Sequence, residues 1–574
     1  MMGLSGDVPK WYRFCLGLIL ATLILGVTIA RAGEAIIKIG MKDEPKTLNP
    51  FRASDTWSRI VVSRFSEPLY TREPKTHRII PWLAEGYPEY DEATNTAIVR
   101  LKKAKWEDGS PLTAHDVVFT GNVIREFKVP RYHYAWRFIK EIEALDDYRI
   151  RFVLEKPMAI FLPRTLMTFI VQKKEWDPVV AEARKAENPL KHLLAHEVTK
   201  PVSCGAFTFV KWARGAYVRI GRNEHFFARG MEVAGRKVGP DVDGILFKFY
   251  GSMDSAILAL KKGDIDYYWA SIQAGYLKDL EGDKRVKVFK SDKSGVYYIA
   301  FNVRKPPFSD KAFRQAVAYL IDKDFIVARV LQNEGQRMDN IVPPGNTFWY
   351  NPDTPIFGKG MKREARIKKA HEILTAAGYT WEKPPVDPKG KVCRGEGLKM
   401  PDGQKVPSFD ILTPPADYDP HRAMAGMLIQ QWLRQVGMPA NSKPSSFGSI
   451  TQQVKVKRDF DAFILGWGSL AIDPDYLRTF FHSKEDRPNG RNPMGYHSNW
   501  YDKIADKSAA TMDESKRRDL IFQMQKFIIE EAPYIPLYVP YEIEAVRIDR
   551  FVDWNEDLDG VGNHWSLILV KPAQ

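Results

Sequence analysis

Cysteine is scarce in this chain. Only three cysteines occur in 574 residues, and one of them, Cys15, lies in an apolar N-terminal stretch. This scarcity excludes a small scaffold held together by many disulfides, which needs a framework of closely spaced cysteines. We expect Cys204 and Cys393 to lie in different parts of the fold and to stay unbonded, because a disulfide needs Cα atoms within about 7 Å.

The signatures of common enzymes are missing as well. The sequence has no Gly-x-Ser-x-Gly, Ser-x-x-Lys or His-Glu-x-x-His motif and no phosphate-binding Gly-Lys-Ser/Thr loop. His192 and His196 have the i, i+4 spacing of two metal ligands on a helix, but no third ligand accompanies them. We therefore expect a protein that is not an enzyme, with no catalytic residues, no bound metal and no cofactor.

Positive charge is plentiful but not concentrated. The formal net charge is +14, and removal of Lys10, Arg13, Arg31 and Asp7 with an N-terminal signal would leave +12. The lysines and arginines are scattered along the chain, and no motif of a nucleic-acid-binding module is present. We expect a solvated basic surface and no nucleic-acid partner.

A long apolar run occurs only near the N-terminus. Residues 14–30 form an apolar stretch free of charge after Lys10 and Arg13, and Ala30-Arg31-Ala32 has the pattern that a signal peptidase cleaves. This predicts a signal peptide over residues 1–32, cleavage after Ala32 and export to the periplasm. An uncleaved anchor stays open as the alternative, since about seventeen residues reach the lower limit for a membrane span.

The length of the chain calls for more than one hydrophobic core, because single cores stop growing near 250–300 residues. Strand and helix patterns alternate without an internal repeat, which is typical of an α/β or mixed architecture. Met424, Leu428 and Trp432 are predicted to share the inward face of one helix. Thr511 and Glu514 predict a capping box at the start of another.

The most distinctive motif is AKWEDGSPLTAHDVVF, residues 104–119. Its centre, residues 107–111, has the composition of a tight turn, and Thr113 with Asp116 matches a capping box that begins a helix. The residues alone therefore predict a strand, a turn and a helix.

The sequence of this run resembles that of the family 5 solute-binding proteins of bacterial ABC importers, which include dipeptide, oligopeptide and nickel binders. The family signature Trp-x-Asp-Gly-x-Pro-Leu-Thr-Ala-x-Asp-Val corresponds here to Trp106 through Val117. The resemblance continues through residues 201–207, 260–266, 302–322, 466–475 and 533–538.

The resemblance implies an α/β fold, a two-lobed periplasmic-binding-protein clamp of the cluster C type with an extra subdomain inserted in lobe I. It places lobe I at residues 33–298 and 541–574, the inserted subdomain at about 75–196, and lobe II at 299–540. The chain would cross a hinge twice, near Tyr298 and near Pro540.

Candidate ligand contacts also follow from the resemblance. Asp55 lies in the family's first ligand-facing loop, with helix capping as the alternative role. The glycines beside Trp467 permit close backbone approach and its ring offers a flat wall, although a purely structural tryptophan is the alternative. The full set of candidates is Ser54, Asp55, Trp57, Cys204, Gly205, Gly466, Trp467, Gly468, Leu470 and Asp473.

Two departures from the family pattern bear on the ligand. Peptide binders of the family hold the ligand's amino terminus with an aspartate in Gly-Trp-x-x-Asp, where this chain has Leu470, which cannot neutralise an ammonium group. Asp473 can replace that aspartate only if the loop is rearranged, and otherwise caps the helix starting at Pro474. Cys204 stands where the family has threonine. Its side chain either lines the cleft or packs in the interior, and the sequence leaves both roles open.

The function implied by the resemblance is the periplasmic component of an ABC import system. It would capture a peptide or peptide-like small solute in the interlobe cleft and deliver it, as a monomer, to a membrane permease and its ATPase. An exported hydrolase, or a sensor or chaperone on the same clamp, is the alternative. The ligand's identity, charge and length are left open.

Overall fold

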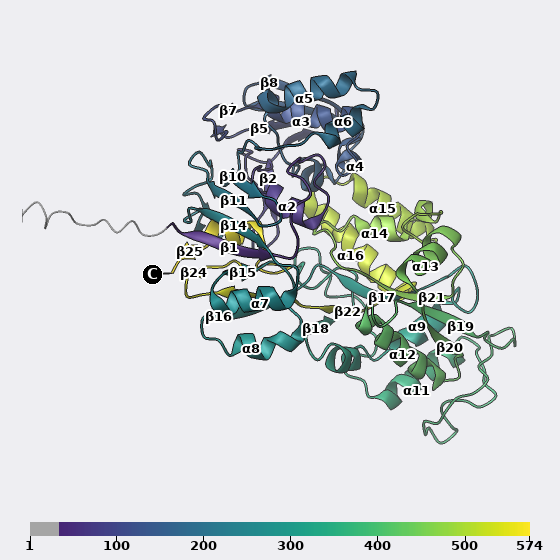
Figure 1. Ribbon diagram of the computed structural model, residues 1–574. Helices are drawn as coiled ribbons and strands as arrows, with labels where there is room; N and C mark the ends of the chain where they lie inside the picture. The colour runs from purple at the N-terminus through teal and green to yellow at the C-terminus, as the bar shows by residue number, and fades with distance from the viewer. Residues whose placement is uncertain (1–33, 574) are drawn as a thin grey trace, which may run out of the picture.

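The computed structural model describes residues 34–573. The expected signal peptide and Cys15 lie outside these residues. Within the described range, no helix is long and apolar enough to cross a membrane. Figure 1 shows two bodies of mixed helix and strand, with a smaller domain on top of the first. We call the body on the seven-stranded sheet lobe I and the body on the six-stranded sheet lobe II.

Lobe I is built on a sheet that joins both ends of the described chain. The strand order is β10-β11-β14-β1-β15-β23-β16, so that the C-terminal strand β23 lies between strands from the first half. Its strands are β1 (Ile36–Met41), β10 (Phe207–Ala213), β11 (Tyr217–Arg222), β14 (Gly244–Phe249), β15 (Tyr267–Tyr268), β16 (Val286–Ser291) and β23 (Glu542–Arg547). Its helices are α2 (Thr56–Val62), α7 (Met253–Lys262), α8 (Leu277–Glu281) and α17 (His564–Leu569).

The smaller domain on lobe I has its own hydrophobic core and a four-stranded sheet in the order β4-β5-β9-β8. Its elements are β4 (Glu89–Asp91), β5 (Thr96–Arg100), β6 (Ala104–Lys105), β7 (Pro111–Leu112), α3 (Ala114–Glu126), α4 (His133–Trp136), β8 (Ile139–Asp146), β9 (Arg149–Leu154), α5 (Lys173–Lys185) and α6 (Pro189–Ala195). The hairpin β2 (Tyr70–Arg72) and β3 (Ile79–Pro81) joins it to lobe I.

Lobe II has one continuous core, from Val296 to Val539, around a sheet in the order β18-β22-β17-β21-β19-β20. The strands are β17 (Val296–Phe301), β18 (Gly335–Arg337), β19 (Phe409–Thr413), β20 (Ala440–Pro444), β21 (Ala462–Trp467) and β22 (Tyr534–Pro540). The helices are α9 (Lys311–Leu320), α10 (Lys323–Phe325), α11 (Arg363–Ala376), α12 (Pro420–Arg434), α13 (Phe447–Thr451), α14 (Tyr476–Phe481), α15 (Asn499–Ala510) and α16 (Glu514–Glu531). The chain passes between the two large sheets at residues 292–295 and at Tyr541. The exact lobe boundaries expected from sequence stay a prediction.

The distinctive run at residues 104–119 forms the expected strand, turn and helix. Strands β6 and β7 pair across a turn in which Gly109 has φ of 82°. Thr113 and Asp116 form the capping box of α3, and the Asp116 carboxylate also accepts from the backbone of Lys173 at 2.8 Å. Because Trp106 is buried against this network, the motif holds the smaller domain together.

Two local expectations were wrong. Of the three residues expected on the inward face of α12, Trp432 is buried and Leu428 packs against the core, but Met424 is 47% exposed, because Ala425, Ile429 and Leu433 share the buried face instead. Helix α16 is capped by Asp513, whose side chain accepts from the backbone of Lys516, so that Thr511 ends the preceding helix. A stronger capping side chain one residue before the helix explains the shift.

Candidate functional site

The parallel strands of the two large sheets have their carboxyl ends on the sides of the sheets that face each other. In lobe I, β1, β14 and β15 are parallel, and β16 runs the same way because it and β15 both pair antiparallel with β23. In lobe II, β19, β20 and β21 end at the edge where β17 begins. Since β16 leads directly into β17, the carboxyl ends of both sets of strands face the gap between the lobes.

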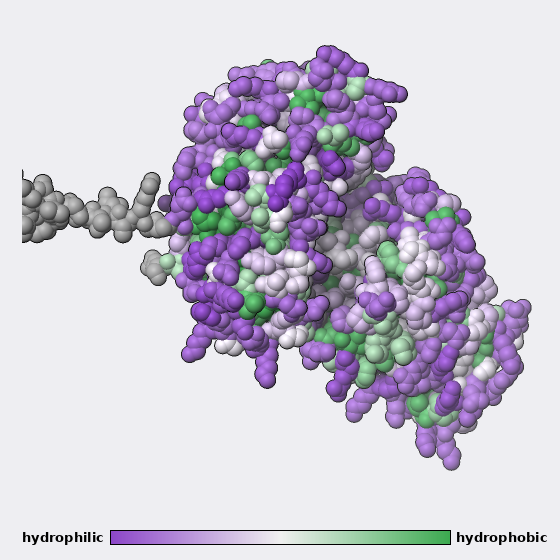
Figure 2. Space-filling model, in the orientation of Figure 1, coloured by the Kyte–Doolittle hydropathy of each residue, from purple (hydrophilic) through white to green (hydrophobic). Residues whose placement is uncertain are grey.

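Ligands of open α/β sheets bind beyond the carboxyl ends of the strands. Figure 2 shows the surface hollowed between lobe I and lobe II at this position. The loops that follow β1, β19 and β21 therefore supply the walls of the candidate site. We call this hollow the interlobe cleft.

Gly466 and Trp467 lie at the cleft edge, as the last two residues of β21. Gly466 pairs with Tyr297, and a Cβ atom added to it would collide with the ring of Tyr297. Trp467 is half-buried and stacks on Phe480 with 4.7 Å between ring centroids. Gly468 is exposed, and a Cβ atom there would meet nothing within 4 Å. One ring face of Trp467 is thus covered by protein.

Leu470 and Asp473 are both buried in the loop after β21. The backbone N–H of Leu470 donates to the carbonyl of Ser294 in the first crossing segment, while its side chain joins the core of lobe II. Asp473 forms an ion pair with Arg517 of α16 and does not cap α14, which starts after Asp475. Burial alone would raise the pKa of Asp473, but the Arg517 guanidinium outweighs burial and lowers it.

These placements correct two expectations. A rearranged Asp473 cannot serve as the anchor for a ligand ammonium group, because it already neutralises a buried guanidinium. Cys204 does not line the cleft: it is 1% exposed within the core of the smaller domain, and burial raises the pKa of its thiol to about 12. Packing inside is therefore the role of Cys204.

The loop after β1 carries the lobe I candidates. Ser54 is exposed, and Asp55 caps α2 by accepting from the backbone N–H of Ser58 at 2.9 Å. Trp57 is half-buried against the core of lobe I. Gly205 lies elsewhere, at a close backbone approach to Arg64 that leaves no room for a Cβ atom. Of these four, Ser54 is the one with an exposed side chain.

Sequence reasoning missed Arg422. It lies in the first turn of α12, after the loop that follows β19, and its guanidinium carbon is 5.5 Å from the ring centre of Tyr297 and 5.7 Å from that of Tyr418. Its Nε donates to Asp419 at 2.7 Å, while its two Nη atoms have no hydrogen-bond partner among residues 34–573. The signal available in the sequence was the Asp-Pro helix start at Asp419, which places Arg422 in the first turn of α12, where it is 7% exposed.

Charged groups also line the crossing segments. Lys293 pairs with Glu542, and Asp559 accepts from the backbone and hydroxyl of Ser294. Burial alone would lower the pKa of Lys293, but the Glu542 carboxylate outweighs it and raises the pKa. These bonds hold the two crossing strands together beside Tyr297.

Metal-binding side chains are not gathered anywhere in the described part of the chain: no group of three His, Cys, Asp or Glu residues is placed to hold an ion. His192 is exposed on α6 and His196 ends that helix.

Curated relatives cover nearly the whole chain. The oligopeptide-binding protein AppA of Bacillus subtilis is 26% identical over 508 residues, which are 88% of this chain and 86% of AppA. The dipeptide-binding protein of Escherichia coli is 25% identical over 557 residues, 91% of this chain and 93% of the relative.

Solved structures share the fold. The unliganded open form of the murein tripeptide-binding protein MppA matches with a TM-score of 0.75 at 19% identity, covering 94% of this chain and 98% of MppA. NikZ from Campylobacter jejuni, in complex with Ni(L-His), matches with a TM-score of 0.66 at 21% identity, covering 94% and 99%. The fold is thus the two-lobed α/β clamp of periplasmic binding proteins.

The family model for bacterial extracellular solute-binding proteins, family 5, matches residues 78–488. This range includes the smaller domain, the first crossing and the Gly466–Trp467 edge of the cleft. The chain belongs to the family 5 extracellular solute-binding proteins.

Proposed function

We propose that the protein captures a peptide or peptide-like solute in the interlobe cleft and delivers it to an ABC permease and its ATPase at the membrane. The observation that carries this proposal is the edge-to-edge arrangement of the two sheets, joined by two short crossings. Such a joint lets the lobes close on a ligand that contacts both, and the ligand's preference for the closed state drives closure.

In this proposal residues 33–298 and 541–574 form lobe I, with the subdomain at about 75–196, and residues 299–540 form lobe II. The N-terminal signal, cleaved after Ala32, exports the chain to the periplasm, where it acts as a monomer. The names of the relatives, an oligopeptide-binding and a dipeptide-binding protein, support a peptide-like solute.

The contacts that we propose lie on both sides of the cleft. On the lobe I side, the solute contacts Ser54 and the loop around Asp55 and Trp57. On the lobe II side, it contacts the strand edge formed by Gly466, Trp467 and Gly468. Gly205 contributes by fixing the backbone of lobe I, and Leu470 through its backbone alone. Asp473 is left out because its carboxylate is paired with Arg517, and Cys204 because it lies in the core of the smaller domain.

Arg422 is the proposed anchor for an anionic group of the solute. The residue is 7% exposed, and its guanidinium lies near two tyrosine rings and pairs with Asp419 through Nε, while both Nη atoms have no protein partner in the described structure. These two Nη atoms can still donate to a ligand carboxylate, and a charged hydrogen bond is stronger than a neutral one. Because Leu470 stands where the resemblance expects the aspartate that holds an amino terminus, we expect a solute with a carboxylate and without an exposed amino terminus.

The test begins with native mass spectrometry of the protein purified from its own host, which identifies a retained solute. Tryptophan fluorescence titration then compares wild type, Arg422→Met and the matched control Arg434→Met, which removes a charge from the far end of α12. We expect Arg422→Met to weaken binding by about tenfold or more for acids and to leave C-terminally amidated analogues unchanged. Absence of binding to peptides, opines, sugars and metal chelates would overturn the proposal.

A further inference from the structure

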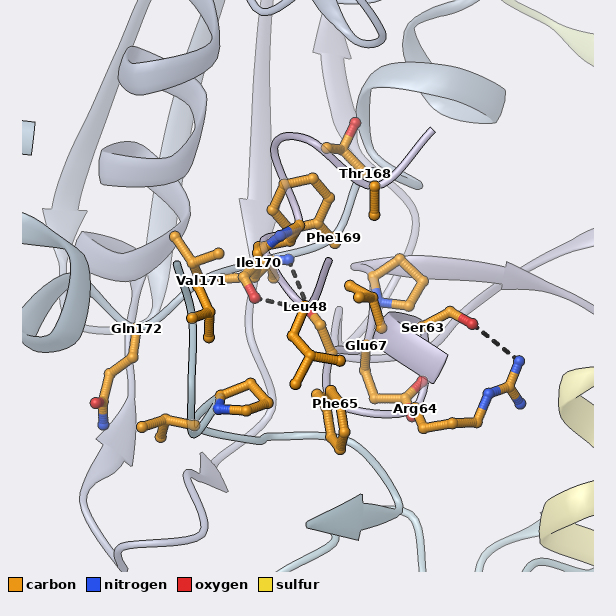
Figure 3. A pocket seen from close by; sticks show the side chains of 18 of the residues that line it. Leu48, Ser63, Arg64, Phe65, Glu67, Thr168, Phe169, Ile170, Val171 and Gln172 are labelled. Carbon is orange, nitrogen blue, oxygen red and sulfur yellow. Dashed lines mark hydrogen bonds between the residues drawn. The ribbon is translucent and has the colours of Figure 1, made fainter. Parts of the chain in front are cut away.

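A well-enclosed cavity lies between lobe I and the smaller domain. It has a volume of about 440 Å³, and its lining residues lie between Leu48 and Val202 in the sequence, with His564 in addition and none from lobe II. Its walls come from the loop after β1, from α2 and the segment after it, from α5, and from the connector before α5. Figure 3 shows residues 168–172 along one side and Phe65, Glu67 and Arg64 along the other.

One part of this cavity wall is polar and incompletely paired. Arg64, Glu67 and His564 all line the cavity, and each has a buried atom without a hydrogen-bond partner in the described structure: Nη1 of Arg64, Oε1 of Glu67 and Nε2 of His564. The three groups are neighbours: His564 Nε2 is 3.7 Å from Glu67 Oε2, and the charge of Arg64 acts on the pKa of both. Buried polar atoms are nearly always hydrogen-bonded, so three orphans together need a partner.

The remaining bonds of these side chains fix their positions. Glu67 Oε2 accepts from Trp82 Nε1 at 2.8 Å, and Arg64 donates from Nε to the carbonyl of Ile60 at 3.0 Å and from Nη2 to Ser63 Oγ at 2.9 Å. Figure 3 shows the bond between Ser63 and Arg64. The polar groups are therefore preorganised.

Charge at this polar end is unbalanced. Glu67 is 2% exposed, and burial raises its pKa to about 8, which leaves it largely protonated at neutral pH. Burial lowers the pKa of His564 to about 3, so this imidazole is neutral. Arg64 then carries a buried positive charge without a full counter-charge, and such a charge is costly unless an anion pairs with it.

The rest of the wall is mainly apolar. Leu48, Phe65, Phe169, Val171 and Trp176 supply aliphatic and aromatic surface, and exposed Arg59 and Glu175 mark the opening. A cavity of this size and composition matches sites that bury small organic ligands. An anion with an apolar body complements both the buried Arg64 and these walls.

We propose that this cavity, which differs from the interlobe cleft in having no lining residue from lobe II, is a second binding site, for a hydrophobic monocarboxylic acid. The carboxylate accepts from Arg64 Nη1 and from the protonated Glu67, and the acyl or aromatic body fills the apolar part. The site goes beyond the proposed capture of a solute in the cleft and does not depend on it.

The test is isothermal titration calorimetry of the exported chain with octanoate and phenylacetate, and with octan-1-ol as a body without the charge. We expect saturable binding of at least one acid, weakened about tenfold or more by Arg64→Gln, as for loss of a charged hydrogen bond. The matched control Arg52→Gln removes an exposed charge outside the cavity and is expected to leave the affinity within about twofold.

A second variant guards against misfolding of Arg64→Gln. Val179→Trp fills the cavity from α5 without touching its polar end, and Val210→Trp places the same side chain on exposed β10. We expect the first to abolish binding and the second to preserve it, with thermal unfolding confirming that both fold. The proposal is overturned if an acid still binds the Val179→Trp variant, or if the cleft solute displaces the acid competitively. It is also overturned if no acid binds at concentrations up to millimolar, which would mean that water alone pairs with the orphan atoms.

Discussion

The guanidinium of Arg517 in α16 holds the carboxylate of Asp473 in the loop after β21, with both side chains buried and Nη2 3.0 Å from Oδ1. The ring of Trp349 lies 5.3 Å from the guanidinium carbon. This pair fastens the loop that leaves the cleft edge onto the interior of lobe II. It also explains why the acidic residue nearest to Leu470 is not available to a ligand.

Breaking this pair is expected to destabilise lobe II strongly. Asp473→Asn leaves Arg517 buried without a counter-charge, a change that costs about 3–5 kcal/mol in comparable pairs. Urea unfolding measures the loss. The control Asp475→Asn breaks the more exposed pair with Arg478 and is expected to cost less than about 1 kcal/mol. Equal losses in the two variants would contradict the role assigned to Asp473.

Gly466 and Gly468 offer a matched pair of substitutions at the cleft edge. Gly466→Ala forces the Tyr297 ring to move, and we expect a loss of about 1–3 kcal/mol in the free energy of unfolding, as for other overpacked sites. Gly468→Ala meets open space and is expected to change stability by less than about 0.5 kcal/mol.

Solute affinity should follow the same order, because Tyr297 lies beside Arg422. Fluorescence titration with the solute retained by the native protein is expected to show about tenfold weaker binding for Gly466→Ala, equivalent to about 1.4 kcal/mol. If Gly468→Ala weakens binding more than Gly466→Ala does, the placement of the solute is wrong.

Glu67 makes stability depend on pH in a stated direction. Its pKa rises from 4.5 to about 8 on folding through burial, so the folded state keeps a proton that the unfolded state releases. The stabilising contribution is complete below pH 4.5 and is lost as pH rises toward 8. A shift of this size corresponds to several kcal/mol at about 1.4 kcal/mol per pH unit.

Glu67→Gln removes that proton equilibrium. Relative to wild type, the variant is expected to gain about 2 kcal/mol or more between pH 5 and pH 8, measured by urea unfolding at both values. A constant difference between variant and wild type across this range would show that Glu67 is ionised in the folded protein.

The two described cysteines are expected to react very differently. Cys204 is buried with a raised thiol pKa, whereas Cys393 is half-buried, and both are free thiols. Iodoacetamide at pH 8 should modify Cys393 in the native protein and reach Cys204 only in denaturant, because the thiolate is the reactive form. Peptide mapping by mass spectrometry distinguishes the two, and equal labelling in the native state would contradict the burial of Cys204.

Local structure was predictable where a few neighbouring residues decide it. The capping box of Thr113 and Asp116 depends on bonds within one turn, and the structure has it. The cap of α16 was misplaced because Asp513 and Thr511 are both good capping residues, and the strength of each depends on how the chain enters the helix.

The candidate site was predictable only in outline. The Gly466–Trp467 edge follows from a motif, but Asp473 could not be assigned, because its partner Arg517 is distant in sequence and reaches it only when α16 packs on the loop. Arg422 was missed for a similar reason, since the rings beside it come from β17 and from the loop after β19.

The sequence by itself determined the family, the alternation of strands and helices and the absence of familiar catalytic motifs, because these depend on local residue patterns. Only the tertiary structure decided which charges are neutralised and which remain open. Asp473 is neutralised by Arg517, whereas within residues 34–573 Arg64 and Arg422 each keep nitrogens without a hydrogen-bond partner, the first beside the cavity in lobe I and the second at the edge of the cleft. Burial and pairing arise from contacts between distant segments, and no pattern within one segment encodes them.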